Sequence, residues 1–284
     1  MPRMTSTEIV VNLAAAGVIA AVLGEALWLL LSVGRQRVAR LATVSAMAAG
    51  AVLVSALVSA FYAWAWPALR AAAPCSLADR WDTHPIAEVA VAFVAWDAAG
   101  YAYHWIGHRT RIGWASHRVH HTGTEYDMTL AWRQSWCPIP ALVVFPTVAL
   151  LGFDLDAVVM CAAVSKLWQA VVHTSLPLRL PRWLVANGMT PESHRRHHTI
   201  DGSAANLGPV FTIWDRLGGT WVGGGVDEQS TYGVADEADV DGVVALEMKG
   251  WLALVGGARN GRQMEPEAAA SATDRTSRSC GGRR

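Results

Sequence analysis

Long apolar runs separated by short polar segments dominate the first part of the chain. Residues 9–33 and 41–66 are each long enough to span a bilayer as a helix that rises about 1.5 Å per residue. Pro67 and Pro74 follow the second run and are expected to end its helix. A third apolar run covers 86–103. The pattern therefore predicts three helices that cross a membrane.

A fourth apolar stretch, residues 139–172, is interrupted by the sequence GFDLD at 152–156. Its two arms, 139–151 and 157–172, would each be roughly 20 to 24 Å long as helices. That length is shorter than the ~30 Å hydrocarbon core of a bilayer. The stretch therefore predicts a helical hairpin that enters the bilayer and returns to the side it left.

Basic residues set the expected orientation. Arg35, Arg37 and Arg40 follow the first apolar run, and positive charge favours the cytoplasmic side. A cleaved signal peptide would carry its basic residues in front of a shorter apolar core, so we expect an uncleaved helix. Alternating crossings then place the end of the third run and both ends of the hairpin in the cytoplasm, at the cell membrane if the source is bacterial.

Composition agrees with a membrane protein. Only 16% of the 284 residues are charged, whereas a soluble domain usually has about a quarter. Basic and acidic residues balance at 23 each, so nothing indicates a nucleic-acid partner. The four cysteines form no CxxC pair, which excludes a thiolate metal site of that kind.

We therefore expect an all-α fold: an integral membrane helical bundle capped by a cytoplasmic, helical, histidine-rich domain. The expected regions are an N-terminal transmembrane hairpin and loop (1–85), a catalytic domain (86–225), an interfacial segment (226–259) and a disordered tail (260–284).

Nine of the ten histidines fall between residues 104 and 198, in groups with helical spacing. Residues three or four apart share one face of a helix, so each group can direct several imidazoles to one place. The candidate metal ligands are His104, His108, His117, His120, His121, His173, His194, His197 and His198.

Neutral imidazoles are good ligands for iron, zinc, copper and nickel. Nine are too many for one zinc ion and suit two ions of higher coordination number. The chain has no HExxH, which excludes the zinc-protease signature, and it lacks the Glu-x-x-His pattern of soluble di-iron bundles. An all-histidine dinuclear centre beside a membrane remains.

The ordered motifs carry a family resemblance. They read HWIGHR, HRVHH, an isolated HT and TPESHRRHH, with flanks WDAAGYAYHWIGHR, EYDMTLAWRQS and ANLGPVFTIWDRLGGTW. Over about residues 85–222 this resembles the fatty acid hydroxylase / sterol desaturase superfamily, in the branch that contains bacterial sterol-desaturase-like proteins and alkylglycerol monooxygenase.

The resemblance implies a centre of two non-haem iron ions that activates O2, with the nine histidines as ligands. It implies hydroxylation or desaturation of a lipid such as a fatty acyl chain or a sterol. Electrons would come from a separate reductase with a ferredoxin or cytochrome b5-like carrier. Two alternatives stay open: a non-catalytic, lipid-binding member of the family, and a membrane metal transporter.

Three polar residues are candidate catalytic or supporting groups. Asp97 lies two helical turns before His104, and a carboxylate inside a membrane helix is usually functional; we expect it to accept the free N–H of a ligand histidine. Glu125 follows the second histidine group, and Asn206 could be a weak ligand or a donor near the site. A structural role is the preferred interpretation for Arg109, Arg133, Gln134 and residues 214–216.

Overall fold

The computed structural model describes residues 35–73, 85–137, 139–201, 204–226, 229–234 and 242–256, together with Ala16, Ala20, Gly24, Leu27 and Leu31. Apart from those five positions, the predicted span at 9–33 lies outside the described residues, and so does the predicted tail at 260–284. Within the described ranges the regular structure is helical, with two isolated β-bridges. The all-α prediction is confirmed.

The longest element is α2, which covers Arg35–Ala71 and is 37 residues long. It extends the predicted 41–66 helix at both ends. The prediction that Pro67 ends this helix is wrong, because Pro67 lies inside it. A proline costs one backbone hydrogen bond to the preceding turn, and here the helix continues for only four residues beyond it.

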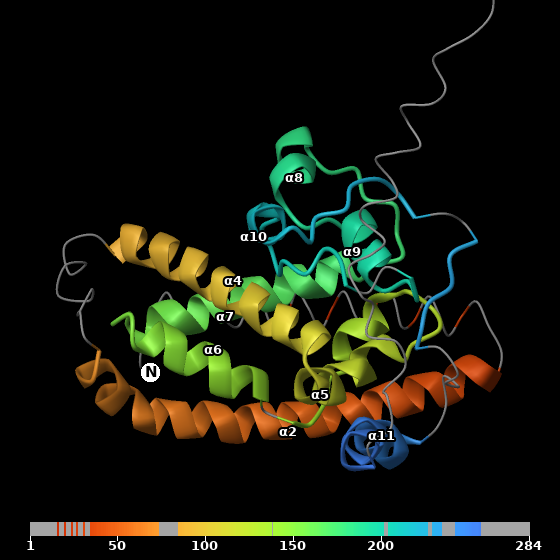
Figure 1. Cartoon of the computed structure of the whole chain (residues 1–284), viewed down its shortest axis with the longest axis horizontal. Coiled ribbons are helices and arrows are strands. Elements are labelled where there is room, and N and C mark those ends of the chain that lie inside the picture. Colours follow the sequence, from red (N-terminus) through yellow and green to blue (C-terminus); the bar gives the residue numbers. More distant parts are fainter. Residues whose placement is uncertain are drawn as a thin grey trace, which may run out of the picture.

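Within the described ranges, three helices are long and apolar enough to cross a membrane: α2, α4 (Pro85–Arg109) and α7 (Leu155–Val172). The shorter α6 (Ile139–Ala149) forms a hairpin with α7, as predicted. Figure 1 shows α6 leading away from the polar end of the bundle and α7 returning to it, with both beside α4. Gly152, at a positive φ of 84°, forms part of the turn between them.

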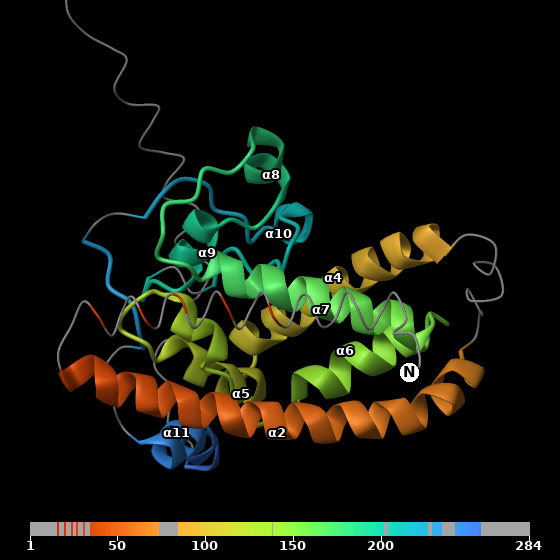
Figure 2. The same ribbon diagram turned by 180° about the vertical axis from the view of Figure 1, so that it is seen from behind.

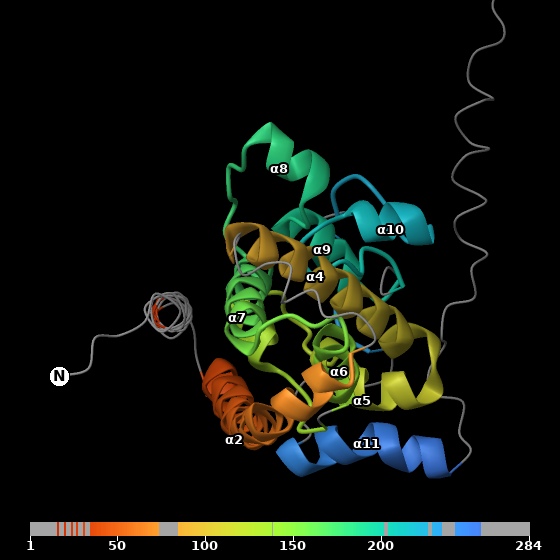
Figure 3. The same cartoon turned by 90° about the vertical axis from the view of Figure 1, so that its left-hand side faces the viewer.

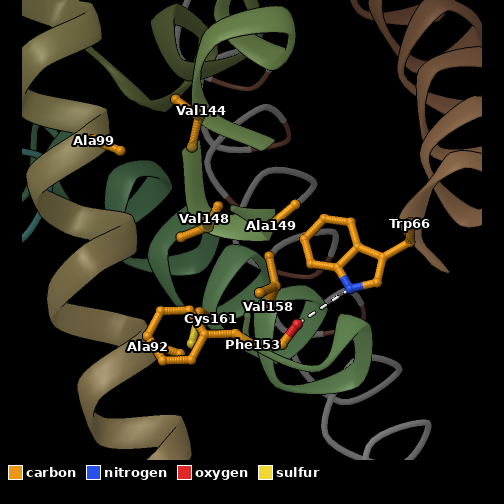
Figure 4. Packing of buried hydrophobic residues seen from close by; sticks show 9 residues of the cluster. All are labelled: Trp66, Ala92, Ala99, Val144, Val148, Ala149, Phe153, Val158 and Cys161. Carbon is orange, nitrogen blue, oxygen red and sulfur yellow. Dashed lines mark hydrogen bonds between the residues drawn. The ribbon is translucent and has the colours of Figure 1, made fainter. Parts of the chain in front are cut away.

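A compact apolar core joins these four helices (Figure 4). Its members are Trp66 of α2, Ala92 and Ala99 of α4, Val144, Val148 and Ala149 of α6, Phe153 of the turn, and Val158 and Cys161 of α7. The Trp66 indole N–H donates to the carbonyl of Phe153 at 3.2 Å, which fixes the hairpin turn against the far end of α2. Alanines at the α4 positions allow the helices to approach closely.

The remaining helices gather at the other end of the bundle, where α4 and α7 end (Figures 1 and 2). They are α5 (Arg111–His121), the 3-10 helix η1 (Met128–Trp132), α8 (Arg182–Asn187), α9 (Pro191–His197), α10 (Ile213–Gly218) and α11 (Val243–Val255). The turn from α4 to α5 is tight: a Cβ at Gly113 would lie 2.3 Å from the carbonyl oxygen of Ile106. Thr110 caps α5 by accepting from the Gly113 N–H at 3.0 Å. This turn brings the first two histidine motifs together.

Candidate metal centre

All nine predicted histidine ligands meet at this end of the bundle, in two adjacent clusters. The five-histidine cluster consists of His104, His108, His117, His121 and His197, and the four-histidine cluster of His120, His173, His194 and His198. Within each cluster, one ring nitrogen from every residue lies within 4.8 Å of the others. The structure thus divides the histidines into two candidate metal sites.

Each HxxHH motif divides its histidines between the two clusters, and the two motifs do so in opposite ways. Helix α5 gives His117 and His121, which are four residues apart, to the five-histidine cluster and His120 to the other. At α9 the pair four residues apart goes to the four-histidine cluster, and only His197 joins the first. Each motif therefore supplies both sites, which couples the two positions.

Backbone carbonyls fix the tautomer of three of these rings. The contacts of Nδ1 are His104 to Leu207 O at 2.7 Å, His173 to Gln169 O at 2.5 Å and His197 to Ala205 O at 2.9 Å. A carbonyl oxygen can only accept, so each Nδ1 must carry the proton. The Nε2 atom of each ring is then left with a free lone pair that can bind a metal ion.

In the four-histidine cluster the Nε2 atoms converge on one point. Nε2 of His173 lies 3.1 Å from Nε2 of His194 and 3.2 Å from Nε2 of both His120 and His198. Neutral rings cannot pair all four of these atoms by hydrogen bonds, because a protonated Nδ1 leaves no proton for Nε2. Two nitrogens bound at right angles to one ion, each ~2.1 Å from it, would lie ~3.0 Å apart. The spacing therefore fits ligands around a shared ion.

The five-histidine cluster shows the same convergence. Nε2 of His117 lies 3.0 Å from Nε2 of His104 and 3.2 Å from Nε2 of His121. Nε2 of His108 and Nε2 of His197 are buried and have no hydrogen-bond partner in the described part of the chain. A buried nitrogen without a partner is costly, so both atoms fit the role of ligands.

Burial keeps these rings neutral. It lowers the pKa of His173 to about 4, and repulsion between neighbouring imidazoles adds to the effect. Burial likewise lowers the pKa well below its usual value in His117, His120, His121, His194, His197 and His198. Neutral imidazole is the form that binds metal ions.

Imidazole rings of the two clusters stack against each other at their boundary. The rings of His121 and His198, from different clusters, are stacked with centroids 4.6 Å apart, and those of His194 and His197 are 5.1 Å apart. An all-nitrogen donor set suits transition metals such as iron and does not suit calcium or magnesium, which take oxygen ligands. The two sites together therefore fit a dinuclear transition-metal centre.

Asp97 is fully buried in α4, but the predicted contact with a histidine is not formed within the described residues. Its carboxylate accepts the backbone N–H groups of Val210 and Phe211 at 2.9 and 3.0 Å and the indole N–H of Trp214 at 2.9 Å. Asp97 therefore anchors the 204–222 segment to α4. A direct catalytic role for it stays a prediction.

Asn206 braces the same segment. Its side-chain amide donates to the carbonyls of Ser193 and Val222 at 2.9 and 3.0 Å and accepts from the Val222 N–H at 2.9 Å. Its backbone has a positive φ of 56°, a conformation that asparagine tolerates better than most residues. Because its amide atoms are engaged with backbone, the arrangement favours a positioning role over metal ligation.

Asp215 supports a ligand histidine indirectly, and the sequence pattern did not single it out for this. Its carboxylate accepts the N–H groups of Leu207 and Gly208 at 2.7 and 2.8 Å and the hydroxyl of Thr220 at 2.7 Å. The Leu207 carbonyl in turn accepts from His104. Burial raises the pKa of Asp215. The signal in the sequence was its place in the DRLGGTW segment.

Glu125 lies in the loop after α5 and pairs with α2. Its carboxylate is 2.7 Å from Nη1 of the buried Arg40, whose Nη2 lies 2.9 Å from Asp127. Between these two acids stands Tyr126, whose ring is stacked on His173 with centroids 6.0 Å apart. Through its pair with Arg40, Glu125 helps to hold this loop against α2. A catalytic role for Glu125 stays a prediction.

Gln134, for which the sequence favoured a structural role, contacts a ring of the four-histidine cluster. Its side-chain amide lies 3.3 Å from Nδ1 of His120. A His120 that binds metal through Nε2 carries its proton on Nδ1, so the amide orients this ring when its oxygen faces Nδ1. Its family-like context, RQS after the second motif, was the available signal. Arg133 beside it is fully buried and donates to the hydroxyl of Thr122 at 2.8 Å, in agreement with a structural role.

The helical bundle, with its candidate membrane spans and two histidine clusters, is typical of a membrane-bound metalloprotein. Comparison with known proteins gives a family of the same kind. Residues 89–220 match the family described as Fatty acid hydroxylase. The matched region, a little under half of the chain, is therefore similar to that family.

Alkylglycerol monooxygenases are similar to about half of the chain. The human protein is 30% identical over 146 residues, which is 50% of this chain and 32% of that protein. The Danio rerio protein is 31% identical, over 46% of this chain and 30% of that protein, and the Caenorhabditis elegans protein is 27% identical, over 52% and 29%. The chain thus matches about a third of the length of these relatives. No solved structure matches the chain significantly.

Proposed function

We propose that the chain is an integral membrane oxidase that holds two iron ions in its histidine clusters and uses O2 and external electrons to hydroxylate a lipid. One observation carries the proposal: nine histidines, eight buried and His104 half-buried, converge as two adjacent sets of candidate metal ligands near the ends of candidate membrane spans. The match of residues 89–220 to the fatty acid hydroxylase family supports the choice of iron and of a lipid substrate.

A bound pair of iron ions would supply the activation of O2 and the attack on an unactivated C–H bond. The chain's own residues do the rest. The nine rings hold the metal through neutral nitrogens, the 204–208 carbonyls keep Nδ1 protonated, and the packed helices exclude water from the clusters. Because electrons must be delivered from outside, we expect a separate reductase with a ferredoxin or cytochrome b5-like carrier.

The position of the clusters supports a substrate that comes from the bilayer. His104 and His108 lie in the last two turns of α4, and His173 directly follows α7. The clusters are thus close to the bilayer edge but not at its middle, where transport sites usually lie. Arg40, one of the basic residues that predict the cytoplasmic side, lies at this same end and pairs with Glu125. We therefore propose that the site faces the cytoplasm.

Hydroxylation is preferred to desaturation because the relatives that match the chain are named as monooxygenases. Because these relatives are named for an alkylglycerol, an ether lipid is the first candidate to try. Fatty acyl chains and sterols are the next, in keeping with the family name.

The test is lipid mass spectrometry of cells that express the chain, grown under 18O2. An oxygen-labelled lipid that is absent from cells with His120→Ala would support hydroxylation, and a loss of two mass units would indicate desaturation. His84→Ala is the matched control, because this tenth histidine lies outside both clusters in the sequence. Identical lipids in all strains, with metal-ion flux in liposomes and no O2 consumption, would favour transport instead.

A further inference from the structure

Helix α2 is too long to lie wholly within a bilayer. Its apolar part, Val38–Ala71, has 34 residues, or about 51 Å at 1.5 Å per residue. The hydrocarbon core of a bilayer is only ~30 Å thick. Part of α2 must therefore lie outside it, and its contacts show which part.

The N-terminal portion of α2 belongs to the polar end of the molecule. Arg40 is buried against Glu125 and Asp127. About two turns further on, the indole N–H of Trp136 donates to the Met47 carbonyl at 3.0 Å. A Cβ at Gly50 would lie 2.2 Å from the same indole, so the ring packs directly on the helix backbone.

If this polar end lies outside the hydrocarbon core, these contacts put the edge of the bilayer near Gly50. Beyond it, residues 51–71 are about 31 Å long as a helix, which matches the hydrocarbon core. This part of α2 carries exposed Leu53, Leu57 and Trp64, as expected of a lipid-facing surface. Trp136 then lies at the boundary, where indoles are favoured.

Helix α11 is fixed at this same level. The carboxylate of Glu247 accepts the backbone N–H of Trp136 at 3.2 Å and the hydroxyl of Ser135 at 3.0 Å. Leu246 packs in one cluster with Met47 of α2 and Val119 of α5. Glu247 and Leu246 thus hold α11 against the protein at the level of Trp136 and Met47.

The direction of α11 differs from that of α2. In Figure 1 α2 lies across the view and α11 is seen nearly end-on, whereas Figure 3 shows α11 lengthwise and α2 foreshortened. Helix α11 therefore crosses α2 instead of following it. If α2 crosses the bilayer, α11 runs along the bilayer surface.

The outward face of α11 is wholly apolar. Every exposed residue of this helix is apolar, and these residues form one stripe at helical spacing: Val244, Ala245, Met248, Leu252 and Val255. Val255 is 87% exposed and Leu252 is 62% exposed. A water-facing helix would carry polar residues on this side.

We propose that α11 is an interfacial anchor whose apolar stripe lies in the lipid surface, between the headgroups and the acyl chains. Its direction, its level beside Gly50 and the apolar composition of its free face all fit a lipid surface. The same helix packs on α5 through Gly250, whose Cβ position would lie 2.3 Å from the Ala115 carbonyl oxygen. Because α5 carries three of the histidines, the anchor sets the height of the metal clusters above the bilayer.

The test is site-specific photo-crosslinking in the full chain, reconstituted in phospholipid nanodiscs. Leu252 is replaced with p-benzoylphenylalanine, the sample is illuminated, and lipid adducts are measured by mass spectrometry. Leu57, exposed in the bilayer part of α2, is the positive control position, and the exposed Asp201 is the aqueous control position. We expect lipid adducts at Leu252 and Leu57 and none at Asp201.

A yield of lipid adducts at Leu252 that is no higher than the background at Asp201 would overturn the proposal. Crosslinks between two copies of the chain at Leu252 would overturn it as well. Bound metal, measured in each variant, confirms that the fold is intact. If the Leu252 variant does not fold, the same probe at Val255, at the end of the helix, replaces it with the same expectation.

Discussion

The two histidine clusters share two helices but differ in size and in what supports them. The five-histidine cluster is oriented by the 204–208 segment, whose carbonyls accept from His104 and His197 and which Asn206 and Asp215 hold in place. The four-histidine cluster instead depends on the end of α7 and on the loop after α5.

That loop is tied to α2 through Arg40, so the four-histidine cluster is connected to α2, whereas the five-histidine cluster takes His104 and His108 from α4. A site with fewer protein ligands also keeps more coordination positions open for other molecules. We therefore propose that the two candidate metal sites serve different tasks. We expect the five-histidine site to be the more tightly bound and the four-histidine site to be the more open to reactants.

The largest effect is expected from removing a ligand. His194→Ala leaves three rings in its cluster and His108→Ala leaves four, so the first change should weaken binding more. Each should lower the affinity of its own ion by at least ~100-fold, the upper end of the loss seen when only an outer partner is removed. Iron analysis with Mössbauer spectroscopy would measure both sites. Equal loss of both ions in both variants would contradict two separable sites.

A substantial stability effect is expected at the tie between α2 and the loop. Arg40→Gln breaks a buried pair and leaves the Asp127 carboxylate without its cation, which should cost about 3 kcal/mol. The matched control is Arg70→Gln at the other end of α2, where the pair with Asp154 is partly exposed and should be worth less than ~1 kcal/mol. Thermal unfolding in detergent measures both. Equal shifts in the unfolding midpoint would show that Arg40 has no special role.

Substitutions of residues that orient the ligand histidines, Asn206 and Gln134, should each affect one cluster. Asn206→Asp keeps the tolerance for positive φ but loses two N–H donors, so it should weaken iron binding in the five-histidine cluster by ~10-fold or more. Gln134→Ala should affect only the four-histidine cluster, and less strongly, because its contact with His120 is longer. Iron titrations followed by site-resolved spectroscopy measure the two affinities. The opposite pattern would contradict the assignment of the supports.

The smallest effect concerns Glu247, which joins α11 to Trp136. Burial raises the pKa of this carboxyl, so the folded protein binds its proton more readily than the unfolded chain does. Its contribution should therefore favour folding as the pH falls through the folded pKa and oppose it at higher pH. Glu247→Gln should remove this dependence, with a change of about 1 kcal/mol or less. Unfolding midpoints from pH 4 to 8 would check it, and an unchanged pH slope would contradict it.

Local patterns in the sequence predicted much of this structure. Helical spacing predicted that the members of each histidine group share a face, and the apolar runs predicted α4 and the hairpin of α6 and α7. These features depend on residues that are close in the chain, and periodicity reports such relations directly.

Relations between distant segments could not be predicted in this way. The division of each HxxHH motif between two clusters depends on how α4, α5 and α9 are rotated against one another. Asp97 contacts backbone N–H groups more than 110 residues away, so its partner could not be inferred from the turn spacing to His104. Arg40 likewise looked like a flanking charge, although it is buried through partners in the loop after α5.

The most direct test of the central claim is an anaerobic Fe(II) titration of the purified, full-length chain, followed by Mössbauer spectroscopy. We predict saturation at about two ions per chain, in two distinguishable sites, and about one tightly bound ion in the His194→Ala variant. Saturation at one ion or fewer, or stoichiometry that does not change in that variant, would contradict a dinuclear centre.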